Sequence, residues 1–248
     1  MKNWKLVFED HFDGDKLDET VWTKEVGMLR KAEPQYFTNE ERNCFVKDSC
    51  LYIRTIKEKY EGAEYTSASI ISGQKKEWMY GRIEMRAKLP RSRSLWPAFW
   101  TLGSNFYDGV DWPKCGEIDI MEMVGGPDKR DNTTISTVHW LAASTNAHDE
   151  CGGYNGGTYT YDKPLCEDFH IYAVEWDAEK MTFFFNDRVV YECVITPDMQ
   201  GAFNQPHYLI LNTSLENWDW DPSHQPGEDT DLPQDYIIDY VRVYQEEK

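Results

Sequence analysis

The sequence predicts an all-β fold, a sandwich of two packed antiparallel sheets, and three observations support this prediction. Helix-period patterns are scarce, period-two runs recur along the chain, and turn residues bound those runs. Many short strands within 248 residues are typical of one β-sandwich. We therefore expect a single domain over residues 1–248, without an internal repeat or a linker rich in Pro or Ser.

Individual strands can be predicted from alternation. Residues 81–89 alternate strictly, with Ile83, Met85 and Ala87 on one face and charged side chains on the other. A short turn at residues 177–180 joins two apolar runs and predicts a hairpin. The expected strands are residues 51–56, 81–89, 169–176, 181–186, 207–212 and 236–244.

Two further segments are expected to be loops. Residues 217–234 are rich in Asp, Pro and Trp, and a long loop in a compact domain is often functional. Residues 151–157 are rich in Gly, but no strand-to-helix context surrounds them, so they do not match a phosphate-binding fingerprint.

Composition narrows the class of partner. The chain carries 44 acidic and 26 basic residues and a net charge of −18. Such a surface repels phosphate backbones and anionic lipids, which argues against nucleic-acid and membrane partners, and it also disfavours sulfated polymers. Ten Trp and fifteen Tyr exceed what a core alone requires and indicate a surface that binds flat, ring-shaped groups. A neutral polymer fits both observations.

The cysteines and the N-terminus bear on the compartment. The six cysteines form no C-x-x-C pair, so scattered buried thiols are the simplest interpretation, although disulfides stay open. No apolar stretch reaches the ~20 residues of a membrane helix, and the first residues do not resemble a signal peptide. The protein is therefore either cytoplasmic or exported by a leader absent from this sequence. The six positions are Cys44, Cys50, Cys115, Cys151, Cys166 and Cys193.

A cluster of acids marks the candidate site. In the run Glu117-Ile-Asp-Ile-Met-Glu122, Glu117 and Asp119 share one face of a strand while the Ile side chains point to the core. Regular alternation would place residue 121 on the acidic face, yet that residue is Met121 and the acid follows one position later. A one-residue bulge at Ile120-Met121 would return Glu122 to the face of the other acids.

Three neighbouring acids on one strand indicate a catalytic role. A neighbouring negative charge raises the pKa of a carboxyl group, so one acid can hold a proton near neutral pH. Retaining glycosidases use such a pair, one ionised nucleophile and one protonated acid about 5–5.5 Å apart. A solvated acidic strand or a calcium site is the alternative from spacing alone, and the apolar flanks favour a buried central strand instead.

At this point the sequence resembles glycoside hydrolase family 16, in its bulged, laminarinase-like form. Besides the acidic run, five ordered segments carry the resemblance over nearly the whole chain. They are residues 8–13, residues 95–103, residues 137–140 with 169–176, and residues 239–244. The resemblance implies a β-jelly-roll sandwich of two curved sheets with an open cleft on the concave face.

The resemblance also implies roles for individual residues. Glu117 would be the nucleophile, Glu122 the general acid and base, and Asp119 their electrostatic helper. No cofactor is required for this catalysis. A structural calcium ion is implied on the convex side at Glu9 and Asp239, although Asp48-Ser49 replaces the usual Asp-Gly turn. The implied substrate-binding residues are Trp96, Trp100, Trp112, His139, Asn43 and Arg86.

We therefore expect a monomeric retaining endo-β-glucanase acting on β-1,3- or mixed β-1,3/1,4-glucan. The loop after Asn212 lacks the Gly-Gly-x-Trp of laminarinase-like members, which leaves the linkage preference open. Alternatives are a hydrolase of algal galactans, a transglycosylase and a non-catalytic glucan-binding lectin on the same sandwich. Lectins usually lose the catalytic acids, and all three acids are present here.

Overall fold

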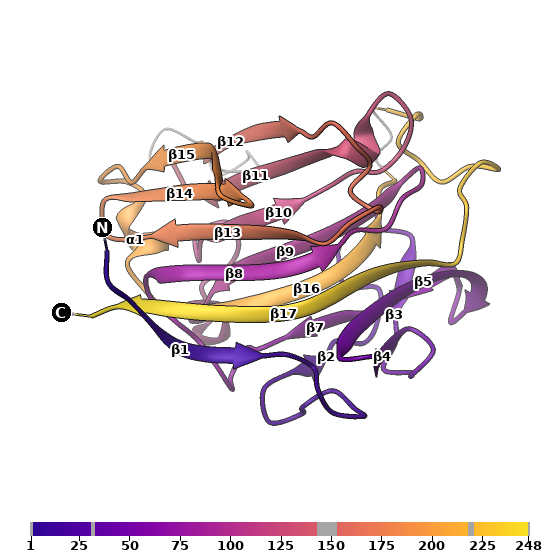
Figure 1. Ribbon diagram of the computed structural model, residues 1–248, viewed down its shortest axis with the longest axis horizontal. Coiled ribbons are helices and arrows are strands. Elements are labelled where there is room, and N and C mark those ends of the chain that lie inside the picture. Colours follow the sequence, from indigo (N-terminus) through magenta and orange to yellow (C-terminus); the bar gives the residue numbers. More distant parts are fainter. Residues whose placement is uncertain (1, 31–32, 143–152, 218–220, 248) are drawn as a thin grey trace.

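A computed structural model of the protein describes residues 2–30, 33–142, 153–217 and 221–247. Two antiparallel β-sheets lie face to face in these residues, which confirms the predicted sandwich (Figure 1). Both termini lie at the same end of the sandwich. Cys151 and Trp218, which belong to two predicted loops, fall outside the described residues.

The first sheet has ten strands in the described residues and forms the front layer of Figure 1. Its main path runs β15-β14-β13-β8-β17-β5-β6-β3, with β1 paired to β17 and β4 to β5. The strands are β1 (Trp4–Asp10), β3 (Gln35–Phe37), β4 (Cys44–Lys47), β5 (Cys50–Tyr60), β6 (Ala63–Ser67), β8 (Gly81–Lys88), β13 (His170–Trp176), β14 (Lys180–Phe185), β15 (Arg188–Val194) and β17 (Gln234–Glu246). The predicted hairpin is β13-β14.

The second sheet lies behind the first and runs β12-β11-β10-β9-β16-β7-β2. Its strands are β2 (Thr23–Lys24), β7 (Ser69–Ile71), β9 (Leu95–Gly103), β10 (Glu117–Glu122), β11 (Thr133–Trp140), β12 (Gly153–Thr160) and β16 (His207–Leu215). The helices are short: α1 (Gln200–Phe203) and the 3-10 turns η1 (Ser104–Asp108) and η2 (Arg130–Asn132). Within the described ranges, none of the helices has the length and apolar content that a bilayer-spanning segment requires.

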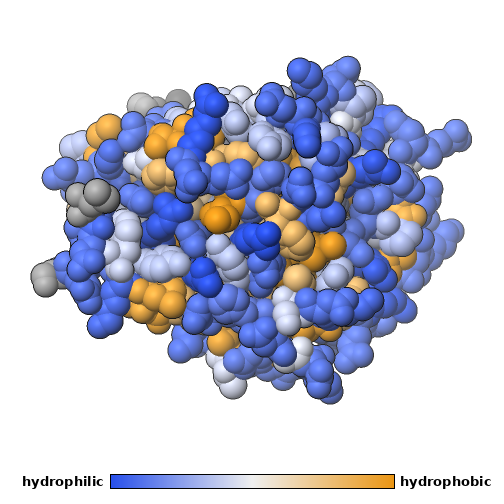
Figure 2. Space-filling model, in the orientation of Figure 1, coloured by the Kyte–Doolittle hydropathy of each residue, from blue (hydrophilic) through white to orange (hydrophobic). Residues whose placement is uncertain are grey.

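The core fills the space between the sheets. Alternation along β8 places Ile83, Met85 and Ala87 in this core, as predicted. Phe99 of β9 and Phe183 of β14 are fully buried in the same apolar cluster. The outer face of the ten-stranded sheet is mainly hydrophilic, with scattered apolar side chains (Figure 2). On β10 of the seven-stranded sheet, the apolar neighbours of the acids enter this core. The acids therefore lie on the outer face of that sheet.

The cysteines follow the simpler interpretation in the part of the chain that the structure describes. The five described cysteines are free thiols, and Cys44, Cys115 and Cys193 are buried. Cys50 and Cys166 are half-buried. Thus apolar packing between the sheets, rather than cross-linking of these five residues, holds the described fold together.

Removal of a core side chain beneath the acidic strand should destabilise the protein. Phe99→Ala deletes a fully buried ring from β9, and we expect a loss of about 3–5 kcal/mol in the free energy of unfolding. Val194→Ala is the control, because Val194 is 70% exposed and its truncation should change stability by less than about 0.5 kcal/mol. Urea unfolding followed by Trp fluorescence measures both variants, and equal midpoints would contradict this account of the core.

Candidate active site

The bulge in β10 is present where the out-of-step Met121 predicts it. Along β9, Asp119 pairs with Trp100, Met121 with Phe99 and Glu122 with Ala98, so Ile120 is the extra residue. Ile120 and Met121 are both buried, which breaks the alternation. The hydroxyl of Ser136 on β11 donates to the Ile120 carbonyl at 3.0 Å and satisfies the bulged backbone.

The bulge brings all three acids to one pocket. Glu117, Asp119 and Glu122 line a cavity of about 120 Å³ on the seven-stranded sheet. Trp96, Ala98 and Trp100 of β9 form its floor beside the acids, because residues two apart on a strand share a face. Arg30, Glu33, Asn212 and Ser214 complete the lining.

Two indole groups hold the outer acids. Trp96 Nε1 donates to Glu122 Oε1 at 2.7 Å, and Trp112 Nε1 donates to Glu117 Oε2 at 2.9 Å. Each donor fixes the position of its carboxylate and favours the ionised form. Trp112 is 38% exposed, so it also presents an apolar face to solvent near the acids.

His139 completes the site from β11. Its Nε2 lies 3.5 Å from Asp119 Oδ2 and 3.8 Å from Glu117 Oε1, and its ring packs against Trp112 at 5.8 Å between centroids. Burial lowers the pKa of His139 to about 4, so the imidazole is neutral over most of the pH range. Glu117, Asp119 and His139 are also the one group of possible metal ligands found among the described residues.

Burial and mutual repulsion raise the pKa of every acid in the cluster. Burial, followed by the charge of Glu122, raises the pKa of Glu117 to about 8. Burial raises the pKa of Glu122 to about 7, and it holds that of Asp119 well above its usual range. Since the three acids interact, their protons leave in steps that belong to the cluster, and the site retains protons near neutral pH.

The structure separates the predicted substrate-binding residues into two groups. Trp96, Trp100, Trp112 and His139 lie around the acids, whereas Asn43 does not. Asn43 is fully buried between strands, where its amide bonds Thr38, Thr66 and the Arg54 carbonyl. The prediction for Asn43 was wrong, because its polar atoms satisfy an interior rather than a cleft.

Arg86 was also assigned wrongly. It lies on β8 in the ten-stranded sheet, not on the sheet of the acids, and pairs with Asp239 at 2.5 Å. Its guanidinium lies over Phe169, 4.7 Å from the ring centroid. Alternation placed its side chain on a polar face correctly, but both sheets have such a face.

The predicted calcium ligands already have cationic neighbours. Asp239 is paired with Arg86, and Glu9 lies 2.9 Å from His11 Nε2 and 3.4 Å from Arg242 Nε. Neither acid belongs to a group of three possible metal ligands among the described residues. The implied site takes most of its oxygen ligands from backbone carbonyls, so calcium at Glu9 and Asp239 stays a prediction.

Several lining residues were missed by the sequence analysis. Asn212 and Ser214 lie on β16, paired with Ala98 and Trp96, and Asn212 accepts a hydrogen bond from Trp100 Nε1 at 2.7 Å. The available signal was that these two polar residues are two apart and directly follow the apolar run of the same strand. Arg30 and Glu33 lie between β2 and β3. This segment has no periodic pattern, so its place in the fold could not be predicted from the sequence.

A β-sandwich with a carboxylate cluster on one sheet and indole groups beside it defines a glycoside hydrolase. The family described as "Beta-porphyranase A-D, GH16 domain" matches residues 4–246, and the chain belongs to glycoside hydrolase family 16. As in other members of this family, catalysis needs no cofactor.

Known proteins support this membership. The "Beta-glucanase" of Rhodothermus marinus is 37% identical over 98% of this chain and 85% of its own length. The catalytic domain of an endo-1,3-beta-glucanase (laminarinase) from Thermotoga petrophila RKU-1 has 34% identity and a TM-score of 0.86, with both chains fully covered. A LamA variant from Z. galactanivorans, solved with laminaritriose and laminaritetraose, has 36% identity and a TM-score of 0.83 over 99% of this chain and all of its own.

The raised pKa of Glu117 makes stability depend on pH. Folding raises this pKa from 4.5 to about 8, so between these values the folded protein holds a proton that the unfolded chain has lost. The free energy of unfolding must therefore fall as pH rises through this window. Glu117→Gln removes the effect, and we expect it to stabilise the protein by at least about 1 kcal/mol at pH 8.5 and by almost nothing at pH 4.5.

Urea unfolding at both pH values measures this difference. Glu41→Gln is the control, because Glu41 is exposed at the surface and its neutralisation removes no buried carboxyl group. The same pH slope in wild type and Glu117→Gln would contradict the buried, repelling arrangement described for the cluster.

Proposed function

We propose that this protein is a retaining endo-β-glucanase that hydrolyses β-1,3- or mixed β-1,3/1,4-glucans by double displacement. The observation that carries the proposal is the bulged strand, which presents Glu117, Asp119 and Glu122 together on one face of the cleft. The similarity to a laminarinase and to a protein that binds laminaritriose supports glucan as the substrate.

The two outer acids are assigned the two chemical roles. Glu122 protonates the glycosidic oxygen while Glu117 attacks the anomeric carbon and forms a glycosyl-enzyme. Glu122 then takes a proton from water, which attacks the same carbon and releases the sugar with retained configuration. The indole donors at Trp96 and Trp112 hold the two carboxyl groups in place throughout.

Asp119 acts between them. It is 3% exposed, and burial followed by the charges of Glu122 and Glu117 holds its pKa well above its usual range. Burial lowers the pKa of the neighbouring His139 to about 4, so the imidazole adds no charge near neutral pH. The pKa of Glu117 is about 8 and that of Glu122 about 7, so the assigned roles require a bound sugar to favour ionisation of Glu117 over that of Glu122.

An algal galactan is the second candidate substrate. It is favoured by one finding, the description of the matching family as a beta-porphyranase. The net charge of −18 and the three acids in the cleft oppose a sulfated polymer, because like charges repel. We therefore place neutral glucan first.

We also propose that the enzyme acts as a monomer outside the cytoplasm. A glucan polymer is too large to enter a cell, so its hydrolysis requires an exported enzyme. The acidic surface and the mainly hydrophilic outer face of the ten-stranded sheet support a monomer, because neither offers a broad apolar interface (Figure 2).

Substitution of the outer acids tests the roles. Glu117→Ala and Glu122→Ala should each lower turnover of laminarin by at least about 1,000-fold, because each removes one partner of the displacement. Added azide should restore cleavage of an activated aryl glucoside and give the α-glycosyl azide with Glu117→Ala but the β-glycosyl azide with Glu122→Ala. NMR of the products measures the anomer, and circular dichroism confirms folding. Identical anomers, or full activity in either variant, would contradict the assignment.

A substrate panel tests the polymer. We expect oligosaccharide products from laminarin and barley mixed-linkage glucan, and none from agarose, porphyran or carrageenan, when products are separated by chromatography. Products from galactans alone would overturn the choice of glucan. Binding to laminarin without any products would favour a lectin.

A further inference from the structure

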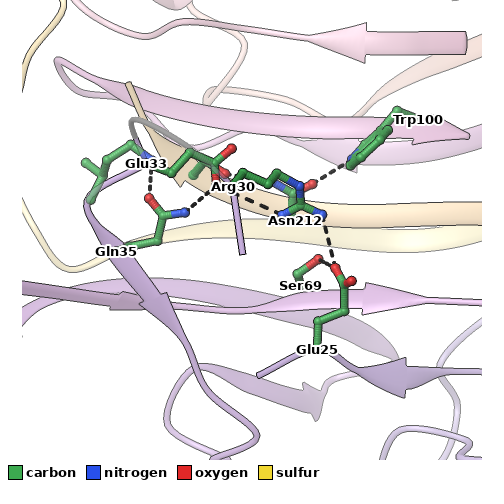
Figure 3. Close-up of polar contacts among 9 residues, drawn as sticks. Glu25, Arg30, Glu33, Gln35, Ser69, Trp100 and Asn212 are labelled. Carbon is green, nitrogen blue, oxygen red and sulfur yellow. Dashed lines mark hydrogen bonds and ion pairs between the residues drawn. The ribbon is translucent and has the colours of Figure 1, made fainter. Parts of the chain in front are cut away.

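Arg30 is the one cationic side chain among the described residues that line the pocket. Its Nη2 lies 3.1 Å from Glu25 Oε2, and the Ser69 hydroxyl donates to the same carboxylate oxygen at 2.6 Å (Figure 3). The guanidinium also lies 5.1 Å from the centroid of the Trp100 ring. Arg30 is therefore held in one position by an ion pair and an aromatic face.

Arg30 belongs to a line of contacts that starts at the catalytic strand. Strand register pairs Glu122 with Ala98, Ala98 with Asn212, and Asn212 with Ser69. Glu25 continues the line, because its backbone N–H donates to the Ser69 carbonyl at 2.9 Å. Figure 3 shows Arg30 beside Asn212, with Trp100 and Glu25 near it.

One donor of this guanidinium is unused in the part of the chain that the structure describes. Arg30 Nη1 is buried and has no hydrogen-bond partner there, and its closest ionic neighbour, Glu33 Oε2, is 4.0 Å away. Protein atoms cover Nη1, so a ligand meets the rest of this side chain, of which 25% is exposed. Because Arg30 lines the pocket, a sugar bound there can contact that exposed part.

Charge selects the kind of acceptor. Glu25 and Glu33 both lie beside Arg30, and Glu117, Asp119 and Glu122 line the same pocket. Glu25 already pairs with the guanidinium at 3.1 Å, so an incoming anion must compete with this carboxylate for the one positive charge. A neutral hydroxyl oxygen accepts the hydrogen bond without that penalty.

We propose that Arg30 is a specificity-determining residue whose guanidinium donates a hydrogen bond to a hydroxyl of a neutral pyranose bound on the β16 side of the reactive sugar. Glu25 and Ser69 position the guanidinium, and Trp100 supports it from one face. The inference rests on the proposed glucanase function and adds to it one contact that a substrate meets only when it extends across β9 and β16.

A comparison of long and short substrates tests this contact. Arg30→Met keeps the apolar stem but removes the donors, and Arg30→Lys keeps the charge but removes the fork. With laminarihexaose and laminarin, Arg30→Met should lower kcat/KM about 10- to 100-fold, chiefly through KM, as expected for a lost hydrogen bond to a charged group. Arg30→Lys should fall between Arg30→Met and wild type. An activated aryl glucoside has no second pyranose to accept this hydrogen bond, so Arg30→Met should lower its cleavage less than that of laminarihexaose.

Arg42→Met is the matched control. Arg42 also bridges two acids, Glu40 and Glu58, and lies over Tyr60, but it is absent from the pocket lining. Its variant should retain wild-type kcat/KM on every substrate. Melting temperatures of all variants show whether an effect reflects loss of structure, and Arg30→Lys keeps the test valid if Arg30→Met is unstable.

The possible failures can be distinguished. Wild-type activity on laminarin with unchanged kcat/KM in Arg30→Met and Arg30→Lys would overturn only the role of Arg30. A loss confined to porphyran oligosaccharides would overturn the neutral acceptor and assign Arg30 to an anion. No wild-type activity on laminarin or barley glucan would overturn the proposed function itself, and equal binding of laminarihexaose to wild type and Arg30→Met in calorimetry would then overturn this inference separately.

Discussion

Repulsion among three carboxyl groups on one strand is the constraint on which the site depends. Removal from water raises the pKa of Glu117, Asp119 and Glu122, and their proximity opposes full ionisation. This unfavourable free energy arises at the site where the proposed mechanism needs one protonated acid and one ionised nucleophile. Two indole groups donate hydrogen bonds to the outer carboxyl groups, and the neutral imidazole of His139 adds no charge beside them.

The bulge connects this electrostatic arrangement to the fold. A regular strand would use Ile120 and Met121 on opposite faces, but here both enter the core. The core thus gains an extra apolar side chain at the point where the surface gains Glu122. The Ser136 hydroxyl satisfies the displaced carbonyl, so the irregular backbone costs little hydrogen bonding. The same extra residue thus fills the core and places Glu122 in the acidic cluster.

Sequence reasoning succeeded where a periodic signal exists. Alternation located β8 and the β13-β14 hairpin, and the out-of-step Met121 located the bulge. It failed for Asn43 and Arg86, since a pattern along one strand does not reveal which sheet a strand joins or which amide is buried. Arg30 lies in an irregular segment, and only tertiary packing against Trp100 and Glu25 brings it to the pocket.

The line of paired residues from Glu122 through Ala98 and Asn212 to Ser69 crosses four strands. Neighbouring strands are ~4.8 Å apart, a step comparable with the length of one pyranose ring. A sugar chain bound across the strands would meet about one strand for each sugar. Substitutions on β16 or β7 would then alter contacts with sugars that lie away from the acids on β10.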